Sequence, residues 1–335
     1  MSPNNSANST KKPQRALQYN ATLSDRIDLT PKLAIFRIKP DAGEAYPDGL
    51  TPDFIPGQYA VLGLNNELKP QLGKTVRAYS IASAPEVKEH IDLYIRYVDQ
   101  PVSENPLTHM LWRMAPGDRL HIAPKIRGRF TIDSTVGDDD PRIKLLVGAG
   151  TGLAPFYSMA CSRLASKNLK DRLVILHGAS YTTDLGYADE LAKLSADHPD
   201  RLAYFPTISR PKECPGWKGD VGRVEAYFDP ERVAELEARL ELGRGGINPD
   251  NAVIYICGLV GTIYEVVDKC LHYGFVPENR MVRRALNLGD VPASLIYEQY
   301  DTTPIVDIKD KTKLEAMLKG TPFEGRVTAG DAQPA

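Results

Sequence analysis

The sequence predicts a β + α/β fold, in which an N-terminal antiparallel β-barrel is followed by a domain built on a parallel sheet. The 335 residues suit two domains of ordinary size. From residue 17 to about residue 133, short apolar or alternating runs are broken by proline and glycine, which is typical of a small antiparallel barrel. Beyond the polar stretch Asp138–Pro141, strand-like and helix-like segments alternate, which indicates a parallel sheet covered by helices.

The first half contains several runs of strand length and one run with helical character. The helix is expected from about Pro106 to Met114, before a turn with the sequence Ala-Pro-Gly-Asp. Strands are expected at Leu33–Ile38, Gln58–Leu64, Ile91–Tyr97 and Arg119–Ala123.

The second half changes to regular alternation. Strands are expected at Ile143–Val147, Leu173–His177, Leu202–Thr207 and Val253–Ile256. Helices are expected directly after a glycine-rich loop and at Tyr187–Leu194, Arg232–Leu242, Thr262–Tyr273 and Lys311–Leu318. These patterns divide the chain into an arm expected to be disordered, a barrel domain, an α/β domain and a C-terminal extension, at residues 1–18, 19–137, 138–300 and 301–335.

Composition excludes several classes of function. With 41 basic and 43 acidic side chains, the chain has no excess charge that would indicate a nucleic-acid partner. No apolar run approaches the ~20 residues needed to cross a bilayer, and the first residues lack the apolar core of a secretory signal. The scattered histidines and the absence of Cys-x-x-Cys argue against a metal centre, an iron–sulfur cluster or a disulfide framework. We expect a cytoplasmic protein without a bound metal. The four cysteines are Cys161, Cys214, Cys257 and Cys270.

A glycine-rich loop follows the first expected strand of the second half. It begins at Gly148, continues through Gly150, Thr151 and Gly152, and ends at Pro155. A strand that ends in glycines and turns into a helix presents free backbone N–H groups, which suit a pyrophosphate. The spacing Gly-x-Gly-x-Gly differs from the Rossmann fingerprint and from the P-loop. An ordinary βα turn is the alternative interpretation.

A second motif, Arg-Ala-Tyr-Ser at residues 77–80, lies in a strand-like run of the first half. Alternation places Arg77 and Tyr79 on one face of the strand and Ser80 on the other. A guanidinium matches a phosphate, an aromatic face suits a flat ring, and a hydroxyl can donate or accept a hydrogen bond. The alternative is a strand with a surface arginine and a core tyrosine.

The third motif is Cys257-Gly258-Leu259, and the order of the three motifs resembles the ferredoxin–NADP(+) reductase superfamily. The likeness spans roughly residues 20 to 300. In that family the Arg-x-Tyr-Ser segment holds a flavin, the Gly-Thr-Gly-x-x-Pro loop holds the nicotinamide cofactor, and Cys-Gly follows on the last central strand. The resemblance therefore implies that the barrel binds FAD and that the α/β domain binds NADP(H).

The same resemblance assigns roles on the flavin side. It implies that Arg77 pairs with a flavin phosphate, that Tyr79 packs on the isoalloxazine ring, and that the Ser80 hydroxyl approaches N5. The Pro106-Leu107-Thr108 segment resembles one that brings helix N-terminal amides to the FAD pyrophosphate. The family has glycine before it where this chain has asparagine, a good N-cap residue. Two phosphate contacts favour FAD over FMN.

Discrimination between NADPH and NADH depends on the ribose 2′ position. No acidic residue follows directly after the second strand, where NAD-specific units grip the 2′-hydroxyl. Ser209, Arg210 and Arg223 resemble the Ser-Arg pair and later arginine that surround a 2′-phosphate in the family, and arginine suits that dianion. Ser180 stands where flavodoxin-reducing bacterial members often have arginine, so NADH stays open, as does the interpretation of both arginines as surface charge.

The resemblance also implies a catalytic set of Ser80, Cys257, Glu298 and Tyr300. The thiol would pack beside nicotinamide C4, the carboxylate would link to the serine, and the tyrosine would cover the flavin. In plastid-type members Glu-x-Tyr ends the chain, whereas here about thirty-five residues follow. We expect this tail to fold back over the FAD or the domain cleft. The alternatives are a small core cysteine and a tyrosine that merely ends a core strand.

These expectations combine into a FAD-containing reductase. It would take a hydride from NADPH and release single electrons to a small acidic carrier, ferredoxin or flavodoxin. Two alternatives stay open, an NAD(P)H-dependent reductase component of an oxygenase and a flavin- or nucleotide-binding regulatory module. Candidates for a locally basic docking face are Lys69, Lys74, Arg127 and Arg283.

Overall fold

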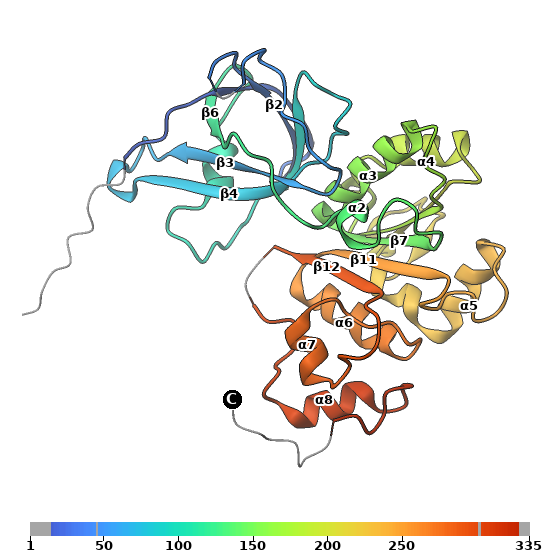
Figure 1. Ribbon diagram of the computed structural model, residues 1–335. Coiled ribbons are helices and arrows are strands. Elements are labelled where there is room, and N and C mark those ends of the chain that lie inside the picture. The colour runs from blue at the N-terminus through green and yellow to red at the C-terminus, as the bar shows by residue number, and fades with distance from the viewer. Residues whose placement is uncertain (1–14, 45, 301–302, 328–335) are drawn as a thin grey trace, which may run out of the picture.

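The computed structural model describes residues 15–44, 46–300 and 303–327, and it contains two six-stranded sheets (Figure 1). The N-terminal sheet is antiparallel, with strand order β4-β3-β6-β1-β2-β5. The second sheet is parallel, with strand order β10-β9-β8-β7-β11-β12. The predicted fold class, an antiparallel barrel followed by a parallel-sheet domain, is confirmed.

The barrel strands alternate between a buried core and the surface. β1 and β2 form a hairpin around Pro31 and Lys32, and apolar residues from all six strands fill the interior. The strands are β1 (Ala21–Thr30), β2 (Leu33–Pro40), β3 (Tyr59–Asn65), β4 (Lys74–Ser80), β5 (Ile91–Arg96) and β6 (Arg119–Ile122). Two short helices and a 3-10 turn complete this half: α1 (Leu107–Leu111), α2 (Ile132–Thr135) and η1 (Pro70–Leu72).

The helix predicted to run to Met114 is shorter than expected. Regular helix ends at Leu111, because the amides of Arg113 and Met114 bond three residues back rather than four. Ala115-Pro116 follows directly, and a residue before proline is disfavoured in the helical region.

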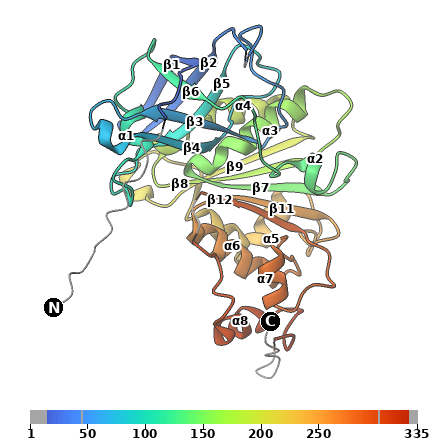
Figure 2. The ribbon, with the colours of Figure 1, turned by 60° about the vertical axis from the view of Figure 1, so that its left-hand side comes forward.

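The parallel sheet has a hydrophobic layer on each face. Along β7, Leu145 and Val147 pack with α5 and α6, whereas Leu146 packs with α3 and with residues of the barrel (Figure 2). The strands are β7 (Ile143–Ala149), β8 (Leu173–Ala179), β9 (Leu202–Ile208), β10 (Asp220–Val221), β11 (Ala252–Gly258) and β12 (Leu295–Gln299). The helices are α3 (Ala154–Ala165), α4 (Ala188–Asp197), α5 (Pro230–Arg239), α6 (Val260–Leu271) and α7 (Arg280–Ala285). The 3-10 turns are η2 (Gly150–Leu153), η3 (Thr182–Asp184), η4 (Pro211–Glu213) and η5 (Val224–Phe228). Within the described residues, no helix has both the length and the apolar character of a membrane span.

The expected position of the C-terminal extension is wrong for residues 303–327. The predicted helix α8 (Lys311–Leu318) is present, but it lies against α6, on the side of the sheet away from the barrel (Figure 1). Leu314, Met317 and Leu318 are buried in the same cluster as residues of α6. The extension therefore covers an apolar helix surface and does not fold over the cleft. Residues 301 and 302, which join it to Tyr300, lie outside the described residues.

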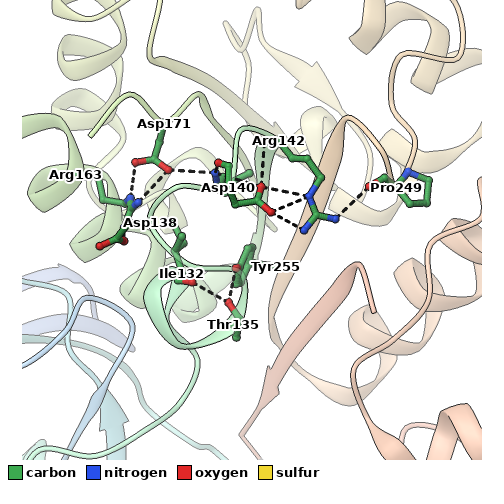
Figure 3. A network of polar contacts seen from close by, with 10 residues as sticks. Ile132, Thr135, Asp138, Asp140, Arg142, Arg163, Asp171, Pro249 and Tyr255 are labelled. Atoms are coloured by element: carbon green, nitrogen blue, oxygen red, sulfur yellow. Dashed lines mark hydrogen bonds and ion pairs between the residues drawn. The ribbon is translucent and has the colours of Figure 1, made fainter. Parts of the chain in front are cut away.

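The polar stretch Asp138–Pro141, at the expected boundary between the two domains, is exposed at Asp138, Asp139 and Pro141, and two of its aspartates also form ion pairs. Lys144 of β7 is fully buried, with its Nζ 3.2 Å from Asp171 and 3.6 Å from Asp140. The Arg163 guanidinium bridges Asp171 at 2.6 Å and Asp138 at 2.8 Å (Figure 3). Because a buried cation needs paired anions, these aspartates fold onto the start of the sheet. They connect the segment after the barrel to β7.

Candidate active site

One row of residues forms at the carboxyl edge of the parallel sheet. Cys257 of β11 is in register with Gly148 of β7 on one side and with Glu298 of β12 on the other. Gly148 is in turn in register with His177 of β8. Because all these strands run in parallel, their ends meet at one edge, which is where open α/β sheets bind ligands.

The glycine-rich loop is packed tightly against this row. A side chain at Gly152 would place its Cβ 2.0 Å from the carbonyl oxygen of Cys257, so only glycine fits. Gly150 has φ +55°, a left-handed conformation that favours glycine. The loop passes through η2, and α3 then begins at Ala154 with Pro155 in its first turn, so the helix follows the loop directly, as the sequence predicts. The start of η2 carries no side-chain cap, which leaves its first backbone N–H groups available for an anion, whereas the amide of Ala154 at the start of α3 donates to the Thr151 carbonyl.

Ser80 and Glu298 join the two halves of the molecule. The buried Ser80 hydroxyl of β4 donates to Oε2 of Glu298 at 3.0 Å. Burial raises the pKa of Glu298 to about 7, although the hydrogen bond from Ser80 opposes that shift. This carboxyl group can therefore hold or release a proton near neutral pH.

Cys257 and Tyr300 form a second contact beside the first. The Cys257 thiol donates to the Tyr300 hydroxyl at 3.3 Å, and that hydroxyl donates to the Thr151 carbonyl of the glycine-rich loop at 2.9 Å. Burial, with a smaller effect of the nearby Glu298 charge, raises the pKa of the Cys257 thiol well above its usual value. The thiol stays protonated and does not act as a nucleophile. Tyr300 is 45% exposed, so its ring lies at the surface while its hydroxyl points inward.

The unbroken register between β3 and β4 places Arg77 and Tyr79 on one face of the strand and Ser80 on the other. Arg77 is exposed, and its guanidinium donates to the carbonyl of Val76 at 2.8 Å. It has no ion pair with any acid in the described part of the chain. Tyr79 packs against the barrel core. Burial raises the pKa of Tyr79, so its phenol stays neutral.

The start of α1 has unused polar groups. Thr108 is only 8% exposed, yet its Oγ1 has no hydrogen-bond partner in the described residues. Pro106 occupies the N-cap position without a side-chain hydrogen bond, and Leu107 packs into the barrel core. Asn105 was expected to cap this helix, and this is wrong. Its side chain accepts from Asn66 at 2.7 Å, because Asn105 lies one residue too early and faces the loop after β3.

The basic residue Arg210 and its neighbours lie where β8 and β9 end. The backbone amides of Ser209 and Arg210 donate to the carbonyls of Ala179 and Ser180. The Arg210 guanidinium lies 5.2 Å above the ring of Tyr181 and donates to its hydroxyl. Tyr181 was missed in the sequence analysis, because an isolated tyrosine after Ser180 carries no motif.

The remaining candidate residues, Arg223, Leu259 and Arg283, take part in none of the contacts described so far. Arg223 is 79% exposed and lies 3.7 Å from Glu225. Leu259 is exposed directly before α6, after Gly258. The guanidinium of Arg283 donates to the carbonyls of residues 288, 289 and 291. Its hydrogen bonds therefore hold the segment after α7, and the side chain does not belong to a free docking face.

His177, one of the scattered histidines, lies fully buried in the row at the sheet edge. Its Nδ1 is 3.0 Å from the Tyr204 hydroxyl, whereas its Nε2 has no hydrogen-bond partner in the described residues. Burial lowers the pKa of His177 to about 3, against a smaller opposing effect of the Gly150 backbone. The imidazole is neutral at physiological pH and cannot supply a positive charge.

Comparison with known proteins identifies related sequences. Residues 146–268 match the family model described as an oxidoreductase NAD-binding domain. The chain is 36% identical over 189 residues to ferredoxin–NADP reductase B of Sorangium cellulosum, which covers 56% of this chain and 68% of that protein. It is 25% identical over 213 residues to one component of the Na(+)-translocating NADH-quinone reductase of Methylococcus capsulatus, which covers 62% of this chain and 48% of that protein.

The fold also resembles solved structures. A ferredoxin NADP+ reductase from Neisseria gonorrhoeae with bound FAD and NADP superimposes with a TM-score of 0.64 at 20% identity. The superposition covers 85% of this chain and 98% of that chain. This likeness supports the two-domain fold.

Proposed function

The chain belongs to the ferredoxin–NADP reductase family, and we propose that it takes a hydride from NADPH onto FAD and passes electrons singly to ferredoxin or flavodoxin. Membership makes the protein an FAD- and NAD(P)-binding oxidoreductase. The proposed reaction rests mainly on one observation, the contact of Ser80 with Glu298 at 3.0 Å, beside the Cys257 thiol. When bound, the flavin supplies the chemistry, which is hydride acceptance followed by release of single electrons.

The residues on the barrel fit a flavin dinucleotide. The orphaned Thr108 hydroxyl and the uncapped start of α1 offer donors to a pyrophosphate. Arg77, exposed and unpaired with any acid in the described residues, offers a guanidinium to the same group. Pro106 and Leu107 would present the helix start, and Tyr79 would pack against the isoalloxazine ring. These donors favour FAD, because its two phosphates could accept hydrogen bonds both from the Arg77 guanidinium and from the donors at the start of α1.

The glycine-rich loop fits the nicotinamide nucleotide. Its members Gly148, Gly150, Thr151, Gly152 and Pro155 would bring uncapped backbone N–H groups to the pyrophosphate. The bare backbone of Gly258 and the exposed Leu259 lie at the same edge of the sheet, beside the place expected for the nicotinamide.

The end of β9 supports a 2′-phosphate. Arg210 and Tyr181 form one group there, with Ser209 alongside and Arg223 as a further exposed cation. No carboxylate stands at the end of β8, where it would repel a 2′-phosphate and grip a 2′-hydroxyl instead.

The four catalytic candidates would have different tasks. Ser80 holds the Glu298 carboxyl, which can exchange a proton near pH 7. Cys257 stays a thiol and sets the distance between reactants, a positioning role that can supply several kcal/mol. The Tyr300 hydroxyl lies between Cys257 and Thr151, so Tyr300 would have to move, as a gate, for a nicotinamide to reach the thiol.

A direct test of the coenzyme is the Arg210→Ala variant. Loss of one charge-assisted contact to a dianion is expected to raise the KM for NADPH about 10- to 100-fold. The KM for NADH and both kcat values should stay unchanged. Equal effects on the two coenzymes would contradict a 2′-phosphate site at Arg210.

A second test identifies the carrier. The holoprotein should reduce ferredoxin or flavodoxin with NADPH, and the rate should fall with rising salt, because a basic face docks an acidic carrier. Lys69, Lys74 and Arg127 are the remaining candidates for that face. A salt-independent rate would argue against such docking.

An NADH-linked reductase component is the second candidate function. The likeness to a component of an NADH-quinone reductase and the serine at residue 180 favour it. Preference for NADH together with failure to reduce ferredoxin and flavodoxin would support this alternative.

A further inference from the structure

The segment between β9 and β10 folds over a small hydrophobic cluster beneath Arg210. The buried members of this cluster are Leu185, Ile208 and Cys214, and Tyr181 and Trp217 pack against them. This cluster is separate from the two larger clusters that cover the faces of the parallel sheet. Its aromatic members come from different segments, Tyr181 from the end of β8 and Trp217 from the loop before β10.

Trp217 is held in place by three contacts. Its indole Nε1 donates to the carbonyl of Asp220 at 2.9 Å, and its backbone amide donates to the carbonyl of Cys214 at 3.1 Å. The indole also lies directly over Gly219, where an added Cβ would fall 2.3 Å from ring atom Cζ2. A side chain at Gly219 would therefore displace the indole ring.

The same cluster supports the partner of Arg210. The guanidinium lies 5.2 Å above the Tyr181 ring and donates to the Tyr181 hydroxyl. An exposed arginine has many rotamers, and ordering it on binding costs affinity. Because Tyr181 rests on the cluster that Trp217 closes, displacing the indole would free both Tyr181 and Arg210.

We propose that Trp217 is a positioning residue that sets the preference for NADPH over NADH, by keeping the Tyr181–Arg210 pair ordered for a 2′-phosphate monoester. This inference rests on the proposed function, in which Arg210 binds the 2′-phosphate. Trp217 itself does not touch the ligand. Its effect is transmitted through the hydrophobic cluster.

Two substitutions displace the indole independently, Trp217→Ala and Gly219→Ala. Gly243→Ala is the matched control, because an added Cβ there meets no atom within 4 Å. Trp217→Phe keeps an aromatic ring on the cluster and serves as the conservative variant. The ligands are adenosine 2′,5′-bisphosphate and 5′-AMP, titrated calorimetrically into each FAD-loaded protein, followed by kcat and KM for NADPH and NADH.

Both displacing variants are expected to bind adenosine 2′,5′-bisphosphate about three- to tenfold more weakly, the cost of reordering one or two side chains. Binding of 5′-AMP, the KM for NADH and kcat should stay at the wild-type values. The control and Trp217→Phe should behave like the wild type.

Three results would overturn the proposal. If Arg210→Ala weakens the bisphosphate but both displacing variants bind it normally, Trp217 has no positioning role, and the proposed function stands. If the displacing variants weaken both ligands equally, the loop is a general structural element. If the wild-type protein binds the bisphosphate no better than 5′-AMP, and Arg210→Ala changes nothing, both the proposal and the 2′-phosphate site are wrong.

Discussion

Ser80 and Glu298 are 218 residues apart in the chain, and their side chains meet at 3.0 Å. Ser80 comes from the barrel and Glu298 from the last strand of the parallel sheet, so folding of both halves is needed to build the pair. The contact leaves Glu298 in surroundings that disfavour its charge, because one hydroxyl hydrogen bond does not replace the lost water. The carboxyl group is thus kept close to neutrality at the cost of some stability.

The titration of Glu298 makes a prediction about stability. Burial raises its pKa from 4.5 to about 7, so between these values the folded protein binds more proton than the unfolded chain. Stability from this group is fully present below about pH 4.5 and is lost as pH rises through 7. Glu298→Gln removes the ionisation and should stabilise the protein at pH 8 by about 2 to 3 kcal/mol, but not at pH 4.5. Urea unfolding at both pH values measures the difference.

The control for this variant is Glu235→Gln, at an exposed position of α5. It should leave the pH dependence of unfolding as in the wild type. A Glu298→Gln protein that is no more stable than the wild type at pH 8 would show that the carboxyl group is not raised in pKa.

Single residues also show what a sequence can and cannot predict about a site. Gly152 and Cys257 were singled out as parts of motifs, and their meeting follows because parallel strands end at one edge. Tyr181 and His177 were not, because their importance depends on tertiary neighbours, Arg210 and Tyr204, that no local pattern reveals. Asn105 was misassigned for the same reason, since its partner Asn66 lies in another loop.

At the scale of elements, the glycine-rich loop is the best-determined part of the site. Its close approach to β11 comes from Gly152, where even one methyl group would meet the Cys257 carbonyl. The loop therefore sets the distance between the end of β7 and the end of β11.

Gly152→Ala should separate the loop from the strand. An added Cβ at 2.0 Å from a backbone oxygen forces one of the two segments to move, so nucleotide binding should weaken at least tenfold. Gly261→Ala provides a control at the same edge, because its added Cβ meets no atom within 4 Å. Binding of NADP+ to each FAD-loaded protein, followed by difference absorbance, is the measurement. Wild-type affinity in Gly152→Ala would contradict this account of the loop.

The strands could be predicted from their apolar runs more readily than the terminal elements could. β7, β8, β9 and β11 were expected because each is a continuous apolar run, as buried parallel strands require. β12 was not placed, since its five residues mix apolar and polar side chains. α8 was predicted as a helix, but its docking surface on α6 could not be, because a helical pattern does not specify its partner.

The position of α8 predicts a structural rather than a catalytic role for the extension. Leu314 is buried in the cluster with α6, so Leu314→Ala should destabilise the protein by about 2 to 5 kcal/mol. The rate of flavin reduction by NADPH below the unfolding transition should not change. Leu68→Ala, at a side chain that is 70% exposed, should have little effect on stability. A slower flavin reduction in Leu314→Ala would instead connect the extension to the cleft.

Across the whole molecule, one contact region joins the barrel to the parallel sheet, and a second ties the segment after the barrel to the start of that sheet. One is a hydrophobic layer shared by α3, α4 and the barrel, to which Tyr94 adds hydrogen bonds with the backbone of Asp184 and Gly186. The other is the ion-pair network around Lys144, at the start of β7 (Figure 3). Because Ser80 reaches Glu298 across the interface between the barrel and the sheet, the first region affects the geometry of the candidate site.

Asp171→Asn tests the second region. Burial by itself would raise the pKa of Asp171, but Arg163 and Lys144 hold that pKa below its usual value. Its stabilising effect is therefore present at neutral pH and is lost as pH falls through the folded-state pKa. The variant leaves two buried cations short of an anion and should lose about 3 to 5 kcal/mol at pH 7, with a smaller difference in acid. Thermal unfolding across pH measures both.

A surface pair provides the comparison. Asp53→Asn removes the partner of Lys88 at an exposed position, where ion pairs contribute little. It should unfold like the wild type. An equally mild effect of Asp171→Asn would mean that the network does not fasten the sheet to the segment after the barrel.

We propose that this protein carries a hydride from NADPH, selected by its 2′-phosphate, to a bound flavin. The most direct test is anaerobic stopped-flow absorbance of the FAD-loaded protein mixed with NADPH or with NADH. We expect rapid bleaching of the flavin by NADPH and much slower bleaching by NADH at the same concentration. Faster bleaching by NADH, or a flavin that neither nucleotide reduces, would contradict it.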